Sequence, residues 1–177
     1  MDVMFFDWIR RGMKVKRFHT EQLLTEDTVG HHSANVAALI LWLYRPARPT
    51  VTLLEAAILH DVAEGSVGDS PAQAKWRHKP LHEALHYLEN VAWQDHNELP
   101  PHHVISSDEE IVLRFADSMD CAIKCVEEMV LGNRSVKHIP PRIFQKIPAL
   151  ISVMDSQVQE QAQILLTYIE EKYDHAS

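Results

Sequence analysis

Histidine is unusually frequent in this sequence, with twelve residues, and imidazole both binds transition metals and exchanges protons near neutral pH. Two of these residues, His32 and His60, lie in apolar stretches, and Asp61 directly follows His60. Asp117 lies in a third apolar stretch, where an unpaired carboxylate is costly. Two imidazoles and two carboxylates suit a borderline divalent cation that keeps positions open for water and phosphate oxygens. We therefore predict a metal centre made of His32, His60, Asp61 and Asp117.

Helices would have to position these ligands, because apolar residues recur with helical spacing almost throughout the chain. The sequence has only five glycines and few β-branched runs, which argues against a sheet protein. We therefore predict a single all-α domain over residues 1–177, folded as a compact helical bundle. The expected helices are Asp2–Arg11, His31–Tyr44, Thr52–Glu64, Leu81–Gln94, one from a capping box at Ser107–Glu110 through Val126, a short piece from Pro140, and Met154–Tyr173.

Helical spacing also predicts the direction of the ligands. His32 shares its stripe with apolar residues and should point inward, whereas the adjacent His31 should face a mixed surface. His60, Asp61 and Glu64 should lie near one face in the last turn of the 52–64 helix.

The segment from His60 to Lys75 carries the most specific pattern in the chain. The string His60-Asp61-Val62-Ala63-Glu64 is followed by Gly68-Asp69-Ser70-Pro71, in a predicted loop, and by Lys75. With His32 upstream and Asp117 downstream, it resembles the HDxxE…GDxP…K pattern of the HD-domain phosphohydrolase superfamily, in its bacterial 5′-deoxynucleotidase branch. The resemblance covers residues 17 to about 120.

The opening tetrad Arg17-Phe18-His19-Thr20 and the short chain are also similar to the small viral dATP triphosphohydrolases. The resemblance therefore implies a metal-dependent deoxynucleotide phosphohydrolase, and we expect hydrolysis of dATP to deoxyadenosine and triphosphate. The alternative within this class is a 5′-deoxynucleotidase that acts on monophosphates. The alternative outside it is a catalytically silent HD module that binds nucleotides or partners, although such a module needs neither Glu64 nor Asp69.

The resemblance assigns chemistry to two further carboxylates and to the metal. Glu64 is expected to accept a proton from the attacking water or to orient that water. Asp69 is expected to protonate the leaving oxygen or to hold a second metal ion. The HD ligands imply Co²⁺, Zn²⁺ or Mn²⁺, and a second ion such as Mg²⁺ would accompany the phosphates.

Substrate contacts are implied as well, because a chain with a net charge of −8 repels phosphate unless the local sign is inverted. Arginine binds phosphate in a bidentate fashion, and lysine acts as a point charge. The expected phosphate contacts are Arg17, Lys75 and Arg114, and the expected base contacts are Phe18, Thr20 and Trp76.

A rival motif, His82-Glu83-Ala84-Leu85-His86, matches the HExxH signature of zinc peptidases. The metzincin continuation fails, because Glu89 and Ala92 replace the glycine and the third histidine. We therefore expect His82 and His86 to be surface residues of a helix. Cys121 and Cys125 are expected to be core thiols, since no second cysteine pair completes a zinc site.

Several classes are excluded by composition. The acidic net charge argues against a stable nucleic-acid complex, and no apolar run is long enough to span a membrane. The first residues lack the features of a signal peptide, and two cysteines suit a reducing cytoplasm, that of the host if the protein is viral. We expect a homo-oligomer, a dimer or a hexamer, with the last helix as a candidate subunit contact.

Overall fold

The structure is a computed structural model that describes residues 3–177, except for the side chains of Ala72, Gln73 and Trp76. These residues form helices and contain no strand longer than one isolated bridge, which confirms the all-α prediction. The helices are α1 (Val3–Gly12), α2 (Val29–Leu43), α3 (Val51–Leu59), α4 (Glu64–Val67), α5 (Ala72–Arg77), α6 (Lys79–Gln94), η1 (Pro101–His103), α7 (Ser107–Val130), α8 (Pro140–Phe144), α9 (Ile147–Ile151) and α10 (Ser156–Ala176).

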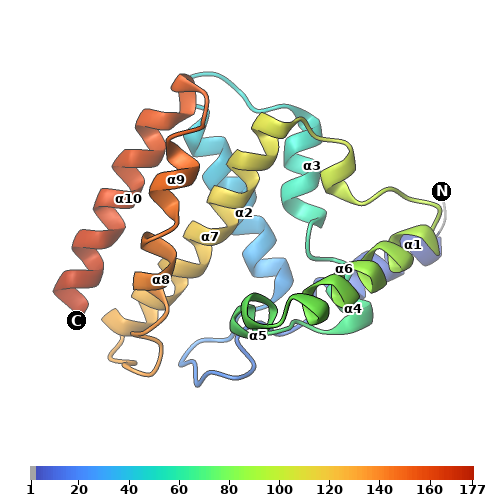
Figure 1. The fold of residues 1–177 in the computed structure, drawn as a ribbon, viewed down its shortest axis with the longest axis horizontal. Coiled ribbons are helices and arrows are strands. Elements are labelled where there is room, and N and C mark those ends of the chain that lie inside the picture. The colour runs from blue at the N-terminus through green and yellow to red at the C-terminus, as the bar shows by residue number, and fades with distance from the viewer. Residues whose placement is uncertain (1–2) are drawn as a thin grey trace.

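The main body is built around α7, which runs through the middle of the molecule (Figure 1). This helix contacts α2, α3, α8, α9 and α10. Its inner stripe includes Phe115 and Met119, which are fully buried against Val36 and Ile40 of α2. Each such side chain contributes about 1.5–3 kcal/mol by leaving water. The α2–α7 contact therefore holds the two helices that carry His32 and Asp117 at a fixed distance.

Helices α1, α4, α5 and α6 form a second packing unit, here called the arm, to one side of the main body (Figure 1). Its own small core contains Trp8, Val62 and Trp93. Gly12 is required where α1 crosses the α3–α4 turn, because a Cβ atom there would lie 2.3 Å from the carbonyl oxygen of Val62. The arm carries the stretch from Glu64 to Lys75, so its packing places that stretch beside the main body.

The predicted helix over Thr52–Glu64 is wrong at its C-terminal end. Helix α3 ends at Leu59, residues 60–63 form turns, and α4 begins at Glu64. Backbone bonds from Val62 N to Leu59 O and from Glu64 N to Asp61 O span three residues instead of four. These tighter turns rotate Asp61 and Glu64 away from the directions that a continuous α-helix would give them.

The predicted capping box of the long helix is displaced by one residue. Ser106 caps α7, since its hydroxyl accepts from the Glu109 N–H and its own N–H donates to Glu109 Oε2 at 2.9 Å. Ser107 and Glu110 have the same spacing, but only Ser106 has the extended backbone of a cap. Helix α5 was not predicted, and α6 begins two residues before the predicted Leu81.

Candidate active site

The side chains that were predicted as metal ligands converge on one place. His32 comes from α2, His60 and Asp61 from the α3–α4 turn, and Asp117 from α7. His32 Nε2 lies 3.2 Å from His60 Nε2 and 3.1 Å from Asp117 Oδ1. One ligand atom from each of these three residues lies within 4.8 Å of the others. Asp61 Oδ2 lies 3.6 Å from His32 Nε2 and 3.4 Å from His60 Nε2.

Both imidazoles are held by their other nitrogen. His32 Nδ1 lies 2.7 Å from Asp120 Oδ2, and His60 Nδ1 lies 2.9 Å from the carbonyl oxygen of Ala57. An acceptor at Nδ1 keeps a proton there in the neutral ring, so the lone pair of each Nε2 faces the shared space. This donor set of two oriented nitrogens and carboxylate oxygens therefore fits a divalent cation.

His32 is fully buried, and its protonation depends on its partners. Burial lowers the pKa of His32, but the hydrogen bonds to Asp117 and Asp120 outweigh burial and raise the pKa to about 10. Without a metal, the buried carboxylates are therefore balanced by a proton on His32. A divalent cation would take over that balancing role, and its binding releases the proton.

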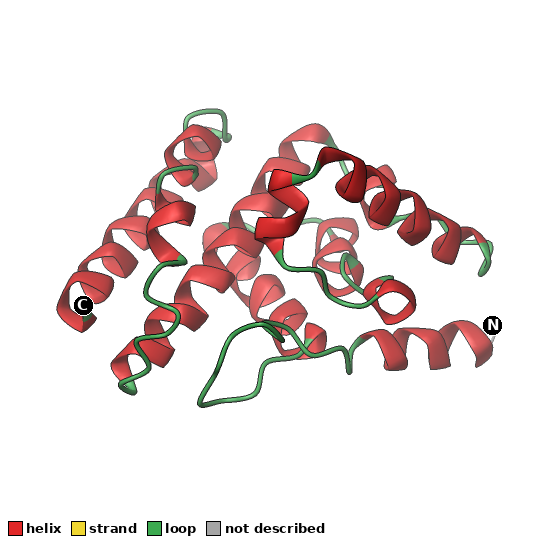
Figure 2. Ribbon diagram, turned by 60° about the horizontal axis from the view of Figure 1, so that its bottom comes forward, coloured by secondary structure: helices red, strands yellow, loops and turns green. Residues whose placement is uncertain are grey.

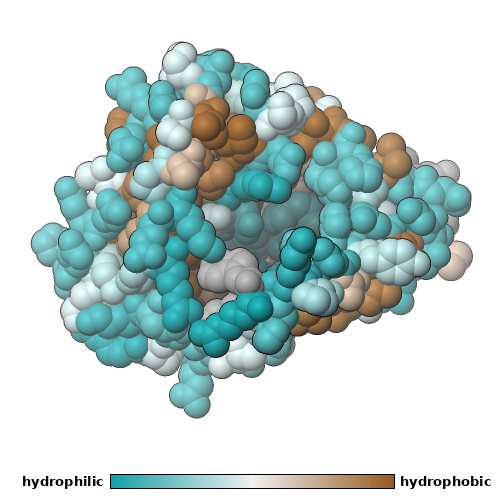
Figure 3. All heavy atoms as spheres, in the orientation of Figure 1, coloured by the Kyte–Doolittle hydropathy of each residue, from teal (hydrophilic) through white to brown (hydrophobic). Residues whose placement is uncertain are grey.

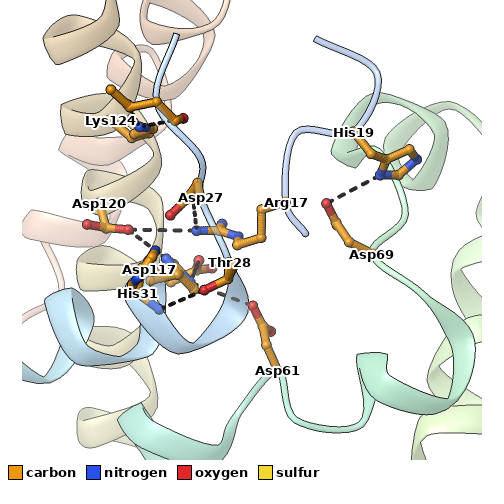
Figure 4. A network of polar contacts seen from close by, with 12 residues as sticks. Arg17, His19, Asp27, Thr28, His31, Asp61, Asp69, Asp117, Asp120 and Lys124 are labelled. Carbon is orange, nitrogen blue, oxygen red and sulfur yellow. Dashed lines mark hydrogen bonds and ion pairs between the residues drawn. The ribbon is translucent and has the colours of Figure 1, made fainter. Parts of the chain in front are cut away.

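Asp120 was not predicted as a site residue, although it is only 3% exposed and contacts His32. Its Oδ2 also lies 3.7 Å from Nη1 of Arg17, which in turn lies 3.5 Å from Asp27 Oδ2. Figure 4 shows Arg17 directed toward Asp27 and Asp120, next to the predicted ligands. In the sequence, Asp120 could have been found from its position three residues after Asp117, which puts both carboxylates on the same helix face.

A cavity of ≈ 570 Å³ opens beside the ligand cluster, a size suited to a small-molecule substrate. Figure 3 shows a hollow in the middle of the face, surrounded largely by hydrophilic residues. The wall contains most of the residues predicted from the sequence, namely Arg17, Phe18, Thr20, Asp61, Glu64, Asp69, Lys75 and Asp117. Loop 14–28, the arm and α7 therefore meet at this cavity.

Glu64 and Asp69 supply two carboxyl groups to the cavity wall. Glu64 is 6% exposed, and its Oε2 atom is buried without a hydrogen-bond partner among the described residues. Burial, together with the negative charges of Asp61 and Asp69, raises the pKa of Glu64 to about 9. Asp69 lies on the α4–α5 loop, where its Oδ2 is 3.7 Å from Nδ1 of His19 (Figure 4). An unpartnered buried carboxyl group is costly unless a ligand or water uses it.

Loop 14–28, which carries Arg17 and Phe18, is fastened to the main body by a buried carboxylate. Glu128 of α7 accepts hydrogen bonds from the backbone N–H groups of Leu24 (2.6 Å) and Thr25 (2.9 Å). Figure 2 shows the loop extending between α1 and α2. Phe18 has a φ of 55°, a left-handed conformation that non-glycine residues rarely adopt, and its ring lies 5.6 Å from Arg17 Cζ. Such strain is typical of functional loops.

One predicted phosphate contact, Arg114, does not line the cavity. Arg114 lies one turn before Asp117 on α7, but its side chain is 68% exposed and pairs with Glu110 at 2.9 Å, away from the cavity wall. A phosphate contact by Arg114 therefore stays a prediction, since this exposed side chain would have to leave Glu110 to reach the cavity. The side chain of Trp76 lies outside the described residues.

Other cavity residues come from positions that the sequence pattern did not single out. Helix α8 and the residue before it contribute Ile139, Arg142 and Ile143, and α7 contributes Cys121. Cys125 is fully buried, as expected for a core thiol, whereas Cys121 is half-buried. No local motif marks α8, since its residues reach the cavity only through packing against α7.

The family profile described as 5′-deoxynucleotidase YfbR-like matches residues 4–166. The chain belongs to this family. A 5′-deoxynucleotidase of Photobacterium profundum is 25% identical over 158 residues, which cover 78% of this chain and 81% of that protein. The fold also matches an HD phosphohydrolase of cyanophage S-2L, named DatZ and bound to dA and one catalytic Zn²⁺ ion (TM-score 0.68, 17% identity, 96% of each chain). An HD-domain phosphohydrolase of Listeria innocua matches with a TM-score of 0.67 and 18% identity, over 96% of this chain and 98% of that one.

This YfbR-like protein is thus an HD-type deoxynucleotide phosphohydrolase, as the HDxxE…GDxP…K string predicted. The peptidase alternative is not supported, because His82, Glu83 and His86 are exposed on α6 and Glu83 pairs with Lys79 at 3.4 Å. Among the described residues, no helix combines the length and apolar character of a membrane span.

Proposed function

We propose that this protein is a metal-dependent 5′-deoxynucleotidase, which hydrolyses deoxynucleoside 5′-monophosphates to deoxynucleosides and inorganic phosphate. The observation that carries the proposal is the convergence of the HD side chains, Glu64 and Arg17 on one cavity. The family profile and the Photobacterium relative carry the name 5′-deoxynucleotidase. These names favour the monophosphate alternative over the dATP triphosphohydrolase that we first expected.

His32, His60, Asp61 and Asp117 would hold the metal. When bound, a divalent ion supplies positive charge at the scissile phosphate and lowers the pKa of a nearby water. The structural neighbour from cyanophage S-2L contains one catalytic Zn²⁺, which supports a borderline ion of this kind here. Zn²⁺, Co²⁺ and Mn²⁺ are the candidates, since the donor set mixes nitrogen and oxygen.

Arg17 and Lys75 bind the phosphate, because both are cationic side chains that line the cavity. Asp27 and Asp120 hold the Arg17 guanidinium in place, so little side-chain entropy is lost when phosphate binds. Phe18 and Thr20 lie on the same loop as Arg17, in position to contact the sugar and base of a nucleotide whose phosphate reaches Arg17.

Glu64 and Asp69 divide the proton transfers. The unpartnered Oε2 of Glu64 lies near Asp61, and the raised pKa keeps Glu64 protonated in the metal-free protein. The positive charge of a bound cation would lower this pKa, and Glu64 would then accept the proton of the attacking water. Asp69 also lines the cavity, near His19, and donates a proton to the 5′ oxygen of the leaving deoxynucleoside.

Product analysis tests the proposal. The metal-free protein is supplied with Zn²⁺, Co²⁺ or Mn²⁺, with and without Mg²⁺, and incubated with matched panels of dNMPs, NMPs and dNTPs. We expect inorganic phosphate from dNMPs and loss of activity in Asp61→Ala. Release of triphosphate from dATP would overturn the monophosphate assignment in favour of a triphosphohydrolase. No turnover with any metal would instead support a silent nucleotide-binding module.

A further inference from the structure

Four histidines outside the candidate active site form a cluster on the surface between α6 and η1. His82 and His86 lie one turn apart on α6, with ring centroids 6.5 Å apart and ring planes only 15° apart. The ring centroid of His86 lies 5.4 Å from that of His102 of η1, and the centroids of His102 and His103 are 4.3 Å apart. None of the four side chains belongs to the wall of the substrate cavity.

One pair of these rings, His86 and His102, has the spacing of imidazoles that share a metal ion, and the cluster becomes a three-ligand site only after side-chain rotation. With metal–nitrogen bonds of about 2.0–2.1 Å and tetrahedral angles, two ligating imidazoles have centroids roughly 5 Å apart. His32 and His60, the ligand pair of the active site, are 5.1 Å apart in this structure. The 5.4 Å between His86 and His102 is close to this value. The 6.5 Å between His82 and His86 requires a small side-chain rotation, which is open to exposed residues.

The electrostatic surroundings suit a cation. Burial, reinforced by His103 and His86, lowers the pKa of His102, which favours the neutral form of the ring that can ligate a metal. The charged groups that act on the cluster are Glu110 and Arg114 from α7 and Glu89 from α6. Arg114 is paired with Glu110, which compensates its charge.

We propose that His82, His86 and His102 form a second, non-catalytic metal site that binds a borderline divalent cation such as Zn²⁺ or Ni²⁺. Two histidines four residues apart on one helix face are an established chelating pair, and His102 completes three nitrogen ligands. This use of the HExxH segment involves no peptidase chemistry, because Glu83 pairs with Lys79 on the exposed surface.

Metal at this site would connect the arm to the main body. Helix α6 belongs to the arm, whereas η1 packs against α3 and leads into α7. The arm also carries Lys75 and Glu64. A bound ion would therefore fasten the arm to the main body through α6 and η1 and stabilise the folded protein without contacting substrate.

Calorimetric titration of tag-free, metal-stripped protein with Ni²⁺ tests the site. We expect two ions per chain in the wild type, one in His86→Ala, one in His60→Ala and none in the double variant. His175→Ala, which removes an exposed histidine of α10, should bind two ions like the wild type. Saturating Ni²⁺ should raise the Tm of His60→Ala by roughly 5–10 °C and leave that of the double variant unchanged.

Unchanged stoichiometry in His86→Ala relative to the wild type would overturn the proposal. If His60→Ala does not fold, the comparison of the wild type with His86→Ala still decides. Deoxynucleotidase turnover should be the same in His86→Ala and the wild type. Because binding is measured without substrate, absence of turnover in every variant would count against the proposed function alone.

Discussion

Asp120 Oδ2 lies 2.7 Å from His32 Nδ1 and 3.7 Å from the guanidinium of Arg17. One buried carboxylate thus orients a candidate metal ligand and also contacts the arginine of the substrate cavity. Both proposed functions of the site, holding the cation and holding the phosphate, would therefore depend on the same side chain. Figure 4 shows this arrangement at the meeting point of loop 14–28, α2 and α7.

Replacement of Asp120 should weaken metal binding. In Asp120→Ala the imidazole of His32 loses its Nδ1 acceptor, and we expect metal affinity to fall about 10–100-fold. Asp120→Asn keeps an acceptor oxygen and should recover part of the affinity. Titration of the metal-free proteins with Zn²⁺ measures both effects, with Asp108→Asn in the exposed first turn of α7 as the control. Equal affinity in all three variants would contradict an orienting role for Asp120.

Arg17 and Arg114 should differ sharply in their effect on catalysis. Loss of charge-assisted hydrogen bonds to phosphate in Arg17→Ala should lower kcat/KM for a dNMP about 10–100-fold. Arg17→Lys should restore little, since lysine cannot make the bidentate contact. Arg114→Ala should retain wild-type kinetics, because that side chain is exposed and paired with Glu110. A loss in Arg114→Ala equal to that in Arg17→Ala would show that Arg114 does reach the substrate.

Glu64 should make the stability of the metal-free protein depend on pH. Its pKa is about 9 in the folded protein, against an ordinary value of 4.5, so the folded state binds more protons between these values. The free energy of unfolding therefore falls as pH rises through this window, and at pH 7 it is ~3 kcal/mol lower than at a pH below 4.5.

Glu64→Gln removes this titration. In the presence of a chelator, the Tm of Glu64→Gln should therefore rise relative to the Tm of the wild type as pH increases from 5 to 8. Its kcat with metal should fall about 10²–10⁴-fold. Thermal melts at several pH values provide the measurement. A difference in Tm that stays constant across this range would argue against a proton held by Glu64.

Glu128 should stabilise the protein with the opposite pH dependence. Burial raises the pKa of Glu128, but hydrogen bonds from Asn133, Thr25 and Leu24 outweigh it and lower the pKa to about 2. The stabilisation is complete above the ordinary pKa of 4.5 and is lost as pH falls toward 2. Glu128→Gln should therefore reduce the free energy of unfolding by ~3 kcal/mol at pH 7 and by much less near pH 2.

Urea unfolding at pH 7 and pH 3 measures this effect. Glu127→Gln is the matched control, because its side chain is the exposed neighbour on the same helix. Since Glu128 fastens the loop that carries Arg17, Glu128→Gln should also raise KM for a dNMP. Equal unfolding free energies in the two variants would show that the loop is held by other contacts.

Local sequence was sufficient to predict the long helices and the residue types of the site. Apolar periodicity identified α2 and α7, because a stripe of apolar residues on one helix face reports directly on burial. The same periodicity predicted that His32 points inward and His31 outward, as the structure confirms. The string from His60 to Lys75 predicted the family, because the chemistry of the site requires these residue types at this spacing.

Tertiary packing decided the rest. The break between α3 and α4 depends on the close approach of α1 at Gly12. The choice between Ser106 and Ser107 as the cap of α7 also depends on the path of the chain. Asp120 became a site residue through its contact with a histidine 88 positions away. Such outcomes follow from long-range contacts, in which residues distant in sequence compete for the same space and charge, so no local pattern encodes them.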